Sequence, residues 1–308
     1  MNGRKNDYTY SRINNLALAP HDFLIDCSEN YHSKVNAAAK AVFDDTSKKI
    51  VMLAGPSSSG KTTTASLISS EISALGGKAY TVSLDDFYYP HSVGYPLDEN
   101  GEPDYECVEA LDIDLIHSCF RKLADCGRAE LPVFNFNTGE REEKPRTVSL
   151  DENDVIIVEG LHALNPIITD TLDSEKLYKI YVSVSSRVYE NDGSVLLSKR
   201  ELRFVRRMVR DYEFRSMTVE RTFEIWGSVM RGEDKYLFPY EGFADIKLNS
   251  FHPCEPCVLA EKAIGLLNGV EKGEYSEKAE LLKNKLSLFK KIDYSILPRD
   301  SLLREFTG

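Results

Sequence analysis

A short glycine-containing segment constrains this chain more than any other feature of its sequence. The segment GPSSSGKT (55–62) follows the apolar run IVML and precedes TTASLISSEISALGG, which has the pattern of an amphipathic helix ending at two glycines. It fits G-x-x-x-x-G-K-[ST] in full, and a position between a strand and a helix separates true phosphate loops from chance matches. The alternative is a turn that is merely rich in glycine and serine. We expect an α/β fold with a phosphate-binding loop.

The residue types in this loop suit a chain of phosphates. Gly55 and Gly60 allow the backbone to curl, so that successive N–H groups and the helix N-terminus converge on phosphate oxygens. Lys61 adds a point charge for the β- and γ-phosphates, and the Thr62 hydroxyl suits Mg²⁺. The predicted nucleotide contacts are Gly55, Pro56, Ser57, Ser58, Ser59, Gly60, Lys61, Thr62 and Thr63.

Strand-like runs alternate with helix-like segments along the chain. The strand-like runs are KKIVMLAG, KAYTVSLDD, DVIIVEG, LYKIYVSV and ADIKLNS, and DIDLIHSCFRKLADCG adds a helix before the third. Continuous apolar strands interleaved with helices indicate a parallel sheet covered on both faces. We expect a P-loop NTPase fold with a five-stranded, mostly parallel sheet, whose ligands bind at the carboxyl ends of the strands.

Other segments depart from this alternation. The stretch 89–105 is rich in Gly, Pro, Asp and Asn, which predicts a loop over the sheet edge, and the segment at about 131–148 predicts a β-hairpin insertion around Asn137-Thr138-Gly139. One helix is expected from Ser28 to Phe43 and another in YSEKAELLKNKLSLFKKI. The predicted divisions are an N-terminal helical extension (1–48), a phosphate-loop domain (49–270) with a helical lid at about 199–240, and a C-terminal helical tail (271–308).

Composition and charge argue against several classes of protein. The net charge of -11 over 308 residues disfavours a general nucleic-acid binder, which needs a basic surface. No run approaches the roughly 20 apolar residues of a membrane span, and MNGRKNDYTYSRINN lacks the apolar centre of a signal peptide. The lone CxxC pair, Cys254 and Cys257, favours reduced structural thiols over a metal site. We expect a cytoplasmic protein without nucleic-acid or membrane partners, and self-association into a homo-oligomer stays open.

Acidic residues stand where two predicted strands end. Glu159 closes DVIIVEG, and because an ionised group at a sheet edge is costly without a cation, Glu159 is a candidate metal-associated residue. SLDDFYY offers Asp85 and Asp86, which face opposite ways if they continue the strand. One of them is a candidate proton acceptor for transfer of a phosphoryl group to a hydroxyl; the alternative is a solvated acidic turn. The pattern does not choose between these two acids.

A basic segment, RELRFVRRMVRDYEFR, follows in this acidic chain. Arg203, Arg206, Arg207 and Arg210 recur at i, i+3, i+4 and i+7, which places them along one stripe of a helix. Such a stripe repels itself unless an anion meets it, and a transferring phosphoryl group is such an anion. The alternative is a solvated helix partly neutralised by Asp211 and Glu213.

The ordered set of GPSSSGKT, SLDDFYY, VEG and the arginine segment resembles the uridine kinase and phosphoribulokinase family of P-loop kinases, from about Lys49 to Ser250. The resemblance implies ATP as phosphoryl donor, Asp85 as the base, and a metal site formed by Thr62, Glu159 and Asp85. It implies catalytic roles for Lys61, Arg207 and Arg210, and nucleotide contacts from Arg210 and Arg215. It further implies an acceptor site that contains Tyr88, Glu106, Phe134, Phe136 and Arg207. His162 is a further candidate for that site, with core packing as the alternative.

Several positions depart from the uridine kinase pattern. Glu106 stands where the family has an acceptor-binding Asp, Phe134 replaces a base-reading Tyr, Gly139 a base-reading His, and Met217 an Arg. A site without those hydrogen-bonding groups does not recognise a pyrimidine in the same way. The resulting hypothesis is phosphorylation, dependent on Mg²⁺ and ATP, of a hydroxyl on a nucleoside or another small polyol. The alternatives are a nucleotide-binding regulator or slow ATPase, and a kinase that acts on a nucleoside monophosphate.

Overall fold

A central parallel sheet organises the computed structural model, which describes residues 8–97, 101–136 and 138–308. The strand order is β11-β8-β1-β7-β2, and every neighbouring pair is parallel. The five predicted strands are confirmed as β1 (Ile50–Ala54), β2 (Ala79–Ser83), β7 (Val155–Glu159), β8 (Leu177–Ser183) and β11 (Ile246–Asn249). The first strand lies at the centre of the sheet, so the loop that follows it opens at the middle of the carboxyl edge.

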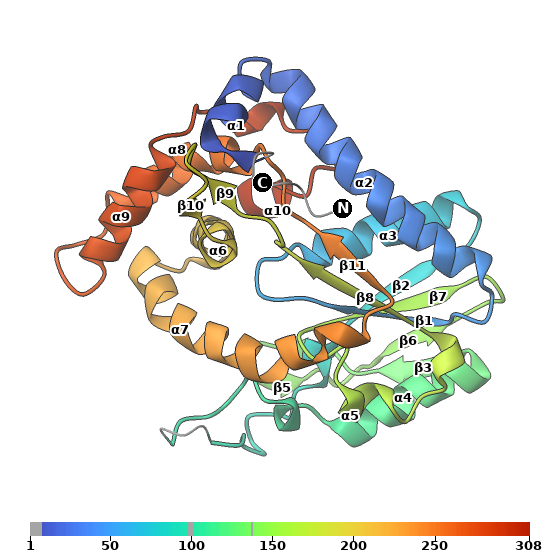
Figure 1. The fold of residues 1–308 in the computed structure, drawn as a ribbon. Coiled ribbons are helices and arrows are strands. Elements are labelled where there is room, and N and C mark those ends of the chain that lie inside the picture. The colour runs from blue at the N-terminus through green and yellow to red at the C-terminus, as the bar shows by residue number, and fades with distance from the viewer. Residues whose placement is uncertain (1–7, 98–100, 137) are drawn as a thin grey trace.

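Helices cover both faces of this sheet (Figure 1). Side chains alternate along β1: Val51 and Leu53 join one buried cluster, whereas Ile50 and Met52 join another on the opposite face. The first cluster includes residues of α2 (Pro20–Asp44), α3 (Lys61–Ala74), α6 (Lys199–Arg215), α7 (Val219–Tyr236), α8 (Glu255–Leu267) and α9 (Ser276–Leu286). The second includes residues of α4 (Ile113–Cys126) and the short α5 (Pro166–Thr169). The expected α/β fold with helices on both faces is confirmed.

The hairpin insertion consists of two short antiparallel ladders. The outer ladder pairs β3 (Arg128–Leu131) with β6 (Arg146–Ser149), and the inner one pairs β4 (Phe134–Asn135) with β5 (Glu140–Arg141). Asn137, one residue of the predicted turn, lies outside the described residues, as do residues 98–100 of the predicted loop. Gly139 has φ +70°, and a Cβ there would lie 2.1 Å from His91 Nδ1, so only glycine fits this turn.

The two terminal segments pack against the same core as the phosphate-loop helix. The predicted helix from Ser28 to Phe43 is too short: α2 begins at Pro20, because Phe23 and Leu24 continue its buried face, and α1 (Tyr10–Leu16) precedes it. The C-terminal helix is shorter than predicted, since α9 ends at Leu286, and a separate helix, α10 (Arg304–Thr307), follows. The division into extension, central domain and tail stays a prediction.

The predicted lid segment contains two long helices. A capping box formed by Ser198 and Glu201 starts α6, and the Thr218 side chain caps the first turn of α7. The small antiparallel pair β9 (Val188–Tyr189) and β10 (Val195–Leu197) leads into α6. Of the helices described, none is long and apolar enough to cross a membrane.

Candidate nucleotide and acceptor site

The phosphate loop has the backbone that its glycines predict. Gly60 adopts φ +90° and Ser58 φ 56°, and a Cβ on Gly55 would lie 2.2 Å from the carbonyl oxygen of Val182. The buried hydroxyls of Ser58 and Ser59 have no hydrogen-bond partner among the described residues. Lys61 Nζ donates to the carbonyl oxygens of Gly55 (2.9 Å) and Pro56 (3.4 Å). The loop therefore presents unpaired donors, with its lysine held on its own backbone.

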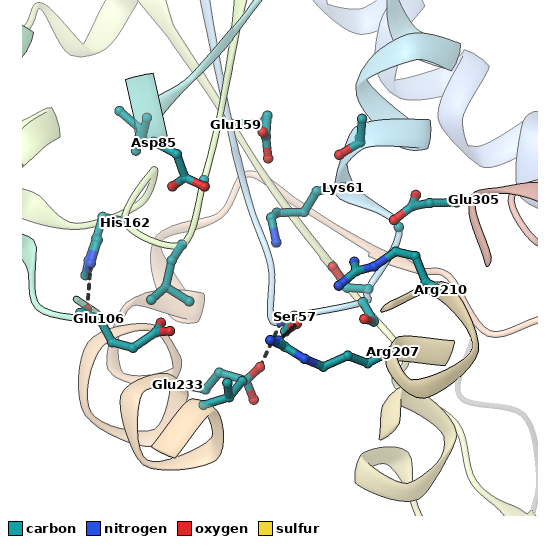
Figure 2. A pocket seen from close by; sticks show the side chains of 18 of the residues that line it. Ser57, Lys61, Asp85, Glu106, Glu159, His162, Arg207, Arg210, Glu233 and Glu305 are labelled. Atoms are coloured by element: carbon teal, nitrogen blue, oxygen red, sulfur yellow. Dashed lines mark hydrogen bonds between the residues drawn. The ribbon is translucent and has the colours of Figure 1, made fainter. Parts of the chain in front are cut away.

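A polar cavity of about 280 Å³ opens over this loop (Figure 2). Most of the predicted site residues line it: Ser57, Ser58, Ser59, Gly60, Lys61, Thr62, Asp85, Tyr88, Glu106, Glu159, His162, Arg207, Arg210 and Arg215. Five others lie outside its lining: Gly55, Pro56, Thr63, Phe134 and Phe136. Residues far apart in the sequence thus meet at the carboxyl edge of the sheet.

Asp85 and Asp86 have separate surroundings. They belong to a 3₁₀ turn (Leu84–Phe87) directly after β2, and Asp86 Oδ1 accepts a hydrogen bond from the backbone N–H of Phe134 (3.2 Å). Asp85 lines the cavity, and the surface that its side chain exposes faces this space. Burial of the group among protein atoms raises its pKa to about 6; the charge of Glu159 raises it further, and Lys61 opposes both effects. Of these two acids, Asp85 is therefore the one that lines the cavity.

The donor set at this edge fits one magnesium ion. Asp85, Glu159 and the hydroxyl of Thr62 line the cavity, and such oxygen ligands are those that Mg²⁺ prefers. The repulsion between Asp85 and Glu159, seen in the raised pKa of Asp85, is negative charge that a cation offsets. Among the described residues, no group of three or more His, Cys, Asp or Glu side chains forms a complete metal site.

Three arginines of α6 converge on the cavity around one buried acid. Asp211, which is 0% exposed, forms ion pairs with Arg207 (3.1 Å), Arg210 (2.7 Å) and Arg215 (3.5 Å). Arg207 also donates to the hydroxyl of Ser57 (2.6 Å). One carboxylate does not neutralise three guanidinium groups, so the cluster keeps a positive charge beside the phosphate loop.

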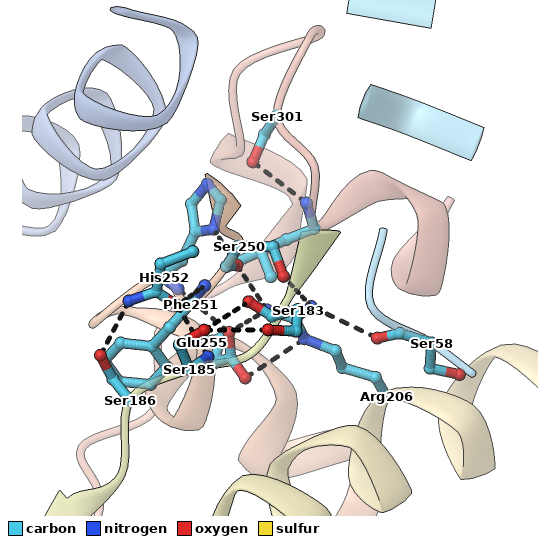
Figure 3. A network of polar contacts seen from close by, with 12 residues as sticks. Ser58, Ser183, Ser185, Ser186, Arg206, Ser250, Phe251, His252, Glu255 and Ser301 are labelled. Carbon is cyan, nitrogen blue, oxygen red and sulfur yellow. Dashed lines mark hydrogen bonds and ion pairs between the residues drawn. The ribbon is translucent and has the colours of Figure 1, made fainter. Parts of the chain in front are cut away.

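The interpretation that all four spaced arginines meet an anion is wrong for Arg203 and Arg206. Arg203 forms a buried bidentate pair with Glu233 (2.6 and 2.8 Å) and donates to Ser57 O (3.0 Å). Arg206 pairs with Glu255 and donates to the carbonyl oxygens of Ser250 (2.8 Å) and Ser58 (3.4 Å), as Figure 3 shows. The alternative of a solvated helix is wrong as well, because both guanidinium groups are buried supports of the loop.

Opposite the arginines, the cavity is lined by Tyr88, Glu106 and His162. Burial raises the pKa of Glu106 to about 7, against the opposing effect of Arg207. Burial lowers the pKa of His162 to about 4, and its Nε2 lies 2.9 Å from the carbonyl oxygen of Glu106, so the neutral ring donates from Nε2. Phe134 and Phe136 contact the Tyr88 ring from outside the cavity, with ring centroids 5.9 and 6.4 Å away.

Two acidic residues that line the cavity were not predicted from the sequence. Glu233 accepts a hydrogen bond from the backbone N–H of Ser57 (2.8 Å) besides its pair with Arg203. Glu305, from α10, accepts one from the hydroxyl of Thr63 (2.6 Å). An acid on the predicted lid helix was a weak signal for Glu233. The sequence held no signal for Glu305, because 242 residues separate it from its partner.

Comparisons with known proteins give the family of this chain. Residues 50–254 match the profile of the Phosphoribulokinase / Uridine kinase family. A uridine kinase of Macrococcus caseolyticus (strain JCSC5402) is 30% identical over 199 residues, which cover 64% of this chain and 85% of that protein, and one of Staphylococcus aureus (strain JH9) gives the same figures. A solved structure of a possible uridine kinase from Bacillus stearothermophilus is 23% identical, with a TM-score of 0.36, and the match covers 44% of this chain and 70% of that one.

The profile match covers more than half of the chain, from the first strand of the sheet to the start of α8. It includes the phosphate loop, the strand ends that hold Asp85 and Glu159, and the arginine helix. The chain therefore belongs to the phosphoribulokinase and uridine kinase family.

Proposed function

We propose that this protein transfers the γ-phosphate of ATP to a hydroxyl group of a small molecule, a nucleoside or a related polyol. Membership of the family supports an ATP-dependent kinase of small molecules. That the phosphoryl group goes to a hydroxyl is our addition. One observation carries it: Asp85, with a pKa of about 6, shares a cavity with the phosphate loop and Lys61. A carboxylate with that pKa is ionised at neutral pH and basic enough to accept a hydroxyl proton.

In this proposal the chain's own residues carry each step. Asp85 takes the proton from the acceptor hydroxyl while the acceptor oxygen bonds to the γ-phosphorus. At the same time the bond between the γ-phosphorus and the β,γ-bridging oxygen breaks, and ADP leaves. Lys61 leaves its loop carbonyls for the phosphates, and Arg207 and Arg210 stabilise the charge that develops on the transferring group. Arg215 contacts the nucleotide phosphates. Mg²⁺, held by Thr62, Glu159 and Asp85, would supply charge neutralisation between the phosphates.

The acceptor would occupy the side of the cavity formed by Tyr88, Glu106 and His162. Glu106 titrates near neutral pH and can accept or donate a hydrogen bond, which suits hydroxyl groups. Tyr88 holds its ring through a hydrogen bond to Tyr105 O (2.6 Å), with Phe134 and Phe136 as the aromatic surface behind it. Arg207 reaches this side too, since its charge affects the pKa of Glu106.

The test is a transfer assay with the purified protein. ATP labelled at the γ-phosphate and Mg²⁺ are incubated with nucleosides, sugars and pentose phosphates, and products are separated by chromatography. Label on an acceptor supports the proposal, and the labelled compound identifies the substrate class. Release of free phosphate alone, with every acceptor unlabelled, would favour the slow ATPase. Binding of ATP with neither product would favour a nucleotide-binding regulator.

A further inference from the structure

The end of the chain packs directly onto the phosphate loop. Leu302, Leu303 and Phe306 are fully buried, and Leu302 lies so close to Gly60 that a Cβ there would be 2.5 Å from Leu302 Cδ1. In Figure 1, α10 lies against α6, the helix that carries the arginines. Residues 297–308, the last part of the predicted tail segment and the part called the tail from here on, therefore pack against the loop, and Glu305 among them lines the cavity.

Several contacts hold this tail in place. Arg304 donates to the carbonyl oxygens of Leu297 (2.6 Å), Pro298 (3.0 Å) and Gly308 (2.8 Å), which closes the segment on itself. The Phe306 ring lies 5.1 Å from the guanidinium of Arg206, which in turn bonds the loop at Ser58 O. Burying each of these large apolar side chains is worth about 1.5–3 kcal/mol, so a nucleotide does not readily displace the whole tail.

One tail side chain uses donors that a phosphate needs. Glu305 Oε2 accepts hydrogen bonds from the hydroxyl (2.6 Å) and the backbone N–H (3.4 Å) of Thr63, at the start of α3. Free N–H groups at a helix N-terminus are the donors with which phosphate loops bind phosphates. Glu305 also lines the cavity, as Lys61 and Arg210 do (Figure 2). A carboxylate of the protein thus occupies part of the anion site.

We propose that Glu305 competes with the phosphates of the nucleotide for Thr63 and sets the affinity of the site. When a nucleotide binds, the Glu305 side chain turns away from Thr63 while the tail stays packed. The inference rests on the proposed function, because its ligand is a nucleoside triphosphate. The tail then stays packed behind the phosphate loop and lowers ATP affinity through one side chain, that of Glu305.

The test measures binding of ATP and of adenosine by isothermal titration calorimetry in wild type, Glu305→Gln and Glu305→Ala. Each variant removes the negative charge of the Glu305 side chain. Glutamine also keeps the size of that side chain, so Glu305→Gln still tests the proposal if Glu305→Ala perturbs folding. We expect ATP to bind about tenfold tighter to both variants, since the competing hydrogen bonds to a charged group are weakened or lost. Adenosine, which has no phosphate, should bind equally to all three. The matched control is Glu261→Gln, an exposed acid on α8 that pairs with Lys291 (3.4 Å).

The outcomes separate the two proposals. If wild type binds ATP and transfers phosphate, but neither Glu305 variant binds ATP more tightly, the competition does not exist and the proposed function stands. Equal tightening for adenosine would also overturn the inference, because the effect would then not involve the phosphates. If neither wild type nor the variants bind ATP, the proposed function and this inference both fail.

Discussion

The substitution Asp85→Asn separates the chemical role of this carboxylate from its cost to the fold. Asparagine keeps the size of the side chain but cannot accept the proton of an acceptor hydroxyl. A positioned general base contributes about 10²- to 10⁴-fold to a rate, so we expect turnover to fall by that range. Binding of ATP in the absence of Mg²⁺ should persist, because the substitution removes negative charge from the cavity and leaves the phosphate loop intact.

The same substitution should stabilise the protein. The pKa of Asp85 rises from 3.8 to about 6, which corresponds to roughly 3 kcal/mol against the ionised form in the folded state. Because water in the cavity screens this group, we reduce the figure to about 1 kcal/mol. The folded-state pKa is the higher one, so the cost is absent below pH 3.8 and complete above about pH 6. The gain from asparagine is therefore largest at pH 8 and shrinks toward pH 4.

The assays are phosphoryl transfer and thermal unfolding at pH 8 and pH 5. The expected rise in melting temperature at pH 8 is about 2 °C for a chain of this size. Asp86→Asn is the matched control, since Asp86 bonds the Phe134 N–H and an amide oxygen can replace that acceptor. A variant at Asp85 that keeps wild-type turnover, or that loses stability at pH 8, would refute the reasoning about this group.

Three further predictions follow from the site. The kcat/KM for the acceptor should fall about tenfold per pH unit below the pKa of Asp85, because the reaction needs this group ionised; bound Mg²⁺ moves that pKa below the value of about 6 in the metal-free protein, and a profile without any fall on the acid side contradicts this role. Glu233→Ala should lower the free energy of unfolding in urea by about 3–5 kcal/mol, because it leaves Arg203 buried without its partner, whereas Glu261→Gln should change little. Glu106→Gln should raise the KM for the acceptor and leave that for ATP unchanged; equal effects on both would place Glu106 outside the acceptor side.

Local sequence patterns predicted the central sheet and the loop and helix that follow its first strand. The five strands, the loop at 55–62 and α3 all follow from periodicity and glycine placement within short windows. The acids Asp85 and Glu159 could be placed at the cavity edge because the carboxyl ends of parallel strands meet there. The choice of Asp85 over Asp86 needed the family resemblance, since the residues after β2 form a 3₁₀ turn and the alternation of a strand no longer applies.

Contacts between distant segments could not be predicted in this way. The spacing of Arg203, Arg206, Arg207 and Arg210 gave the helix correctly but not its surroundings, because nothing local shows that Glu233 and Glu255 lie opposite two of them. The stripe is wide enough that one part of it contacts the core while the other faces the cavity. A periodic pattern therefore places side chains on a helix, and tertiary packing decides which of them are free to bind a ligand.

The buried arginines link the support of the loop to the charge of the site. Arg203 donates a hydrogen bond to Ser57 O and Arg206 donates one to Ser58 O, so both arginines hold carbonyl groups of the loop in place. Glu233 accepts a hydrogen bond from the Ser57 N–H. Each of these arginines has its own buried carboxylate, whereas Arg207, Arg210 and Arg215 share Asp211 alone. Asp211 alone therefore leaves formal positive charge on the part of α6 that lines the cavity, where the carboxylates of Asp85, Glu106 and Glu305 act on it. Burial of matched pairs at Arg203 and Arg206 leaves Arg207, Arg210 and Arg215 as the arginines of α6 that line the cavity, so an acidic protein can hold an anion there without a basic surface.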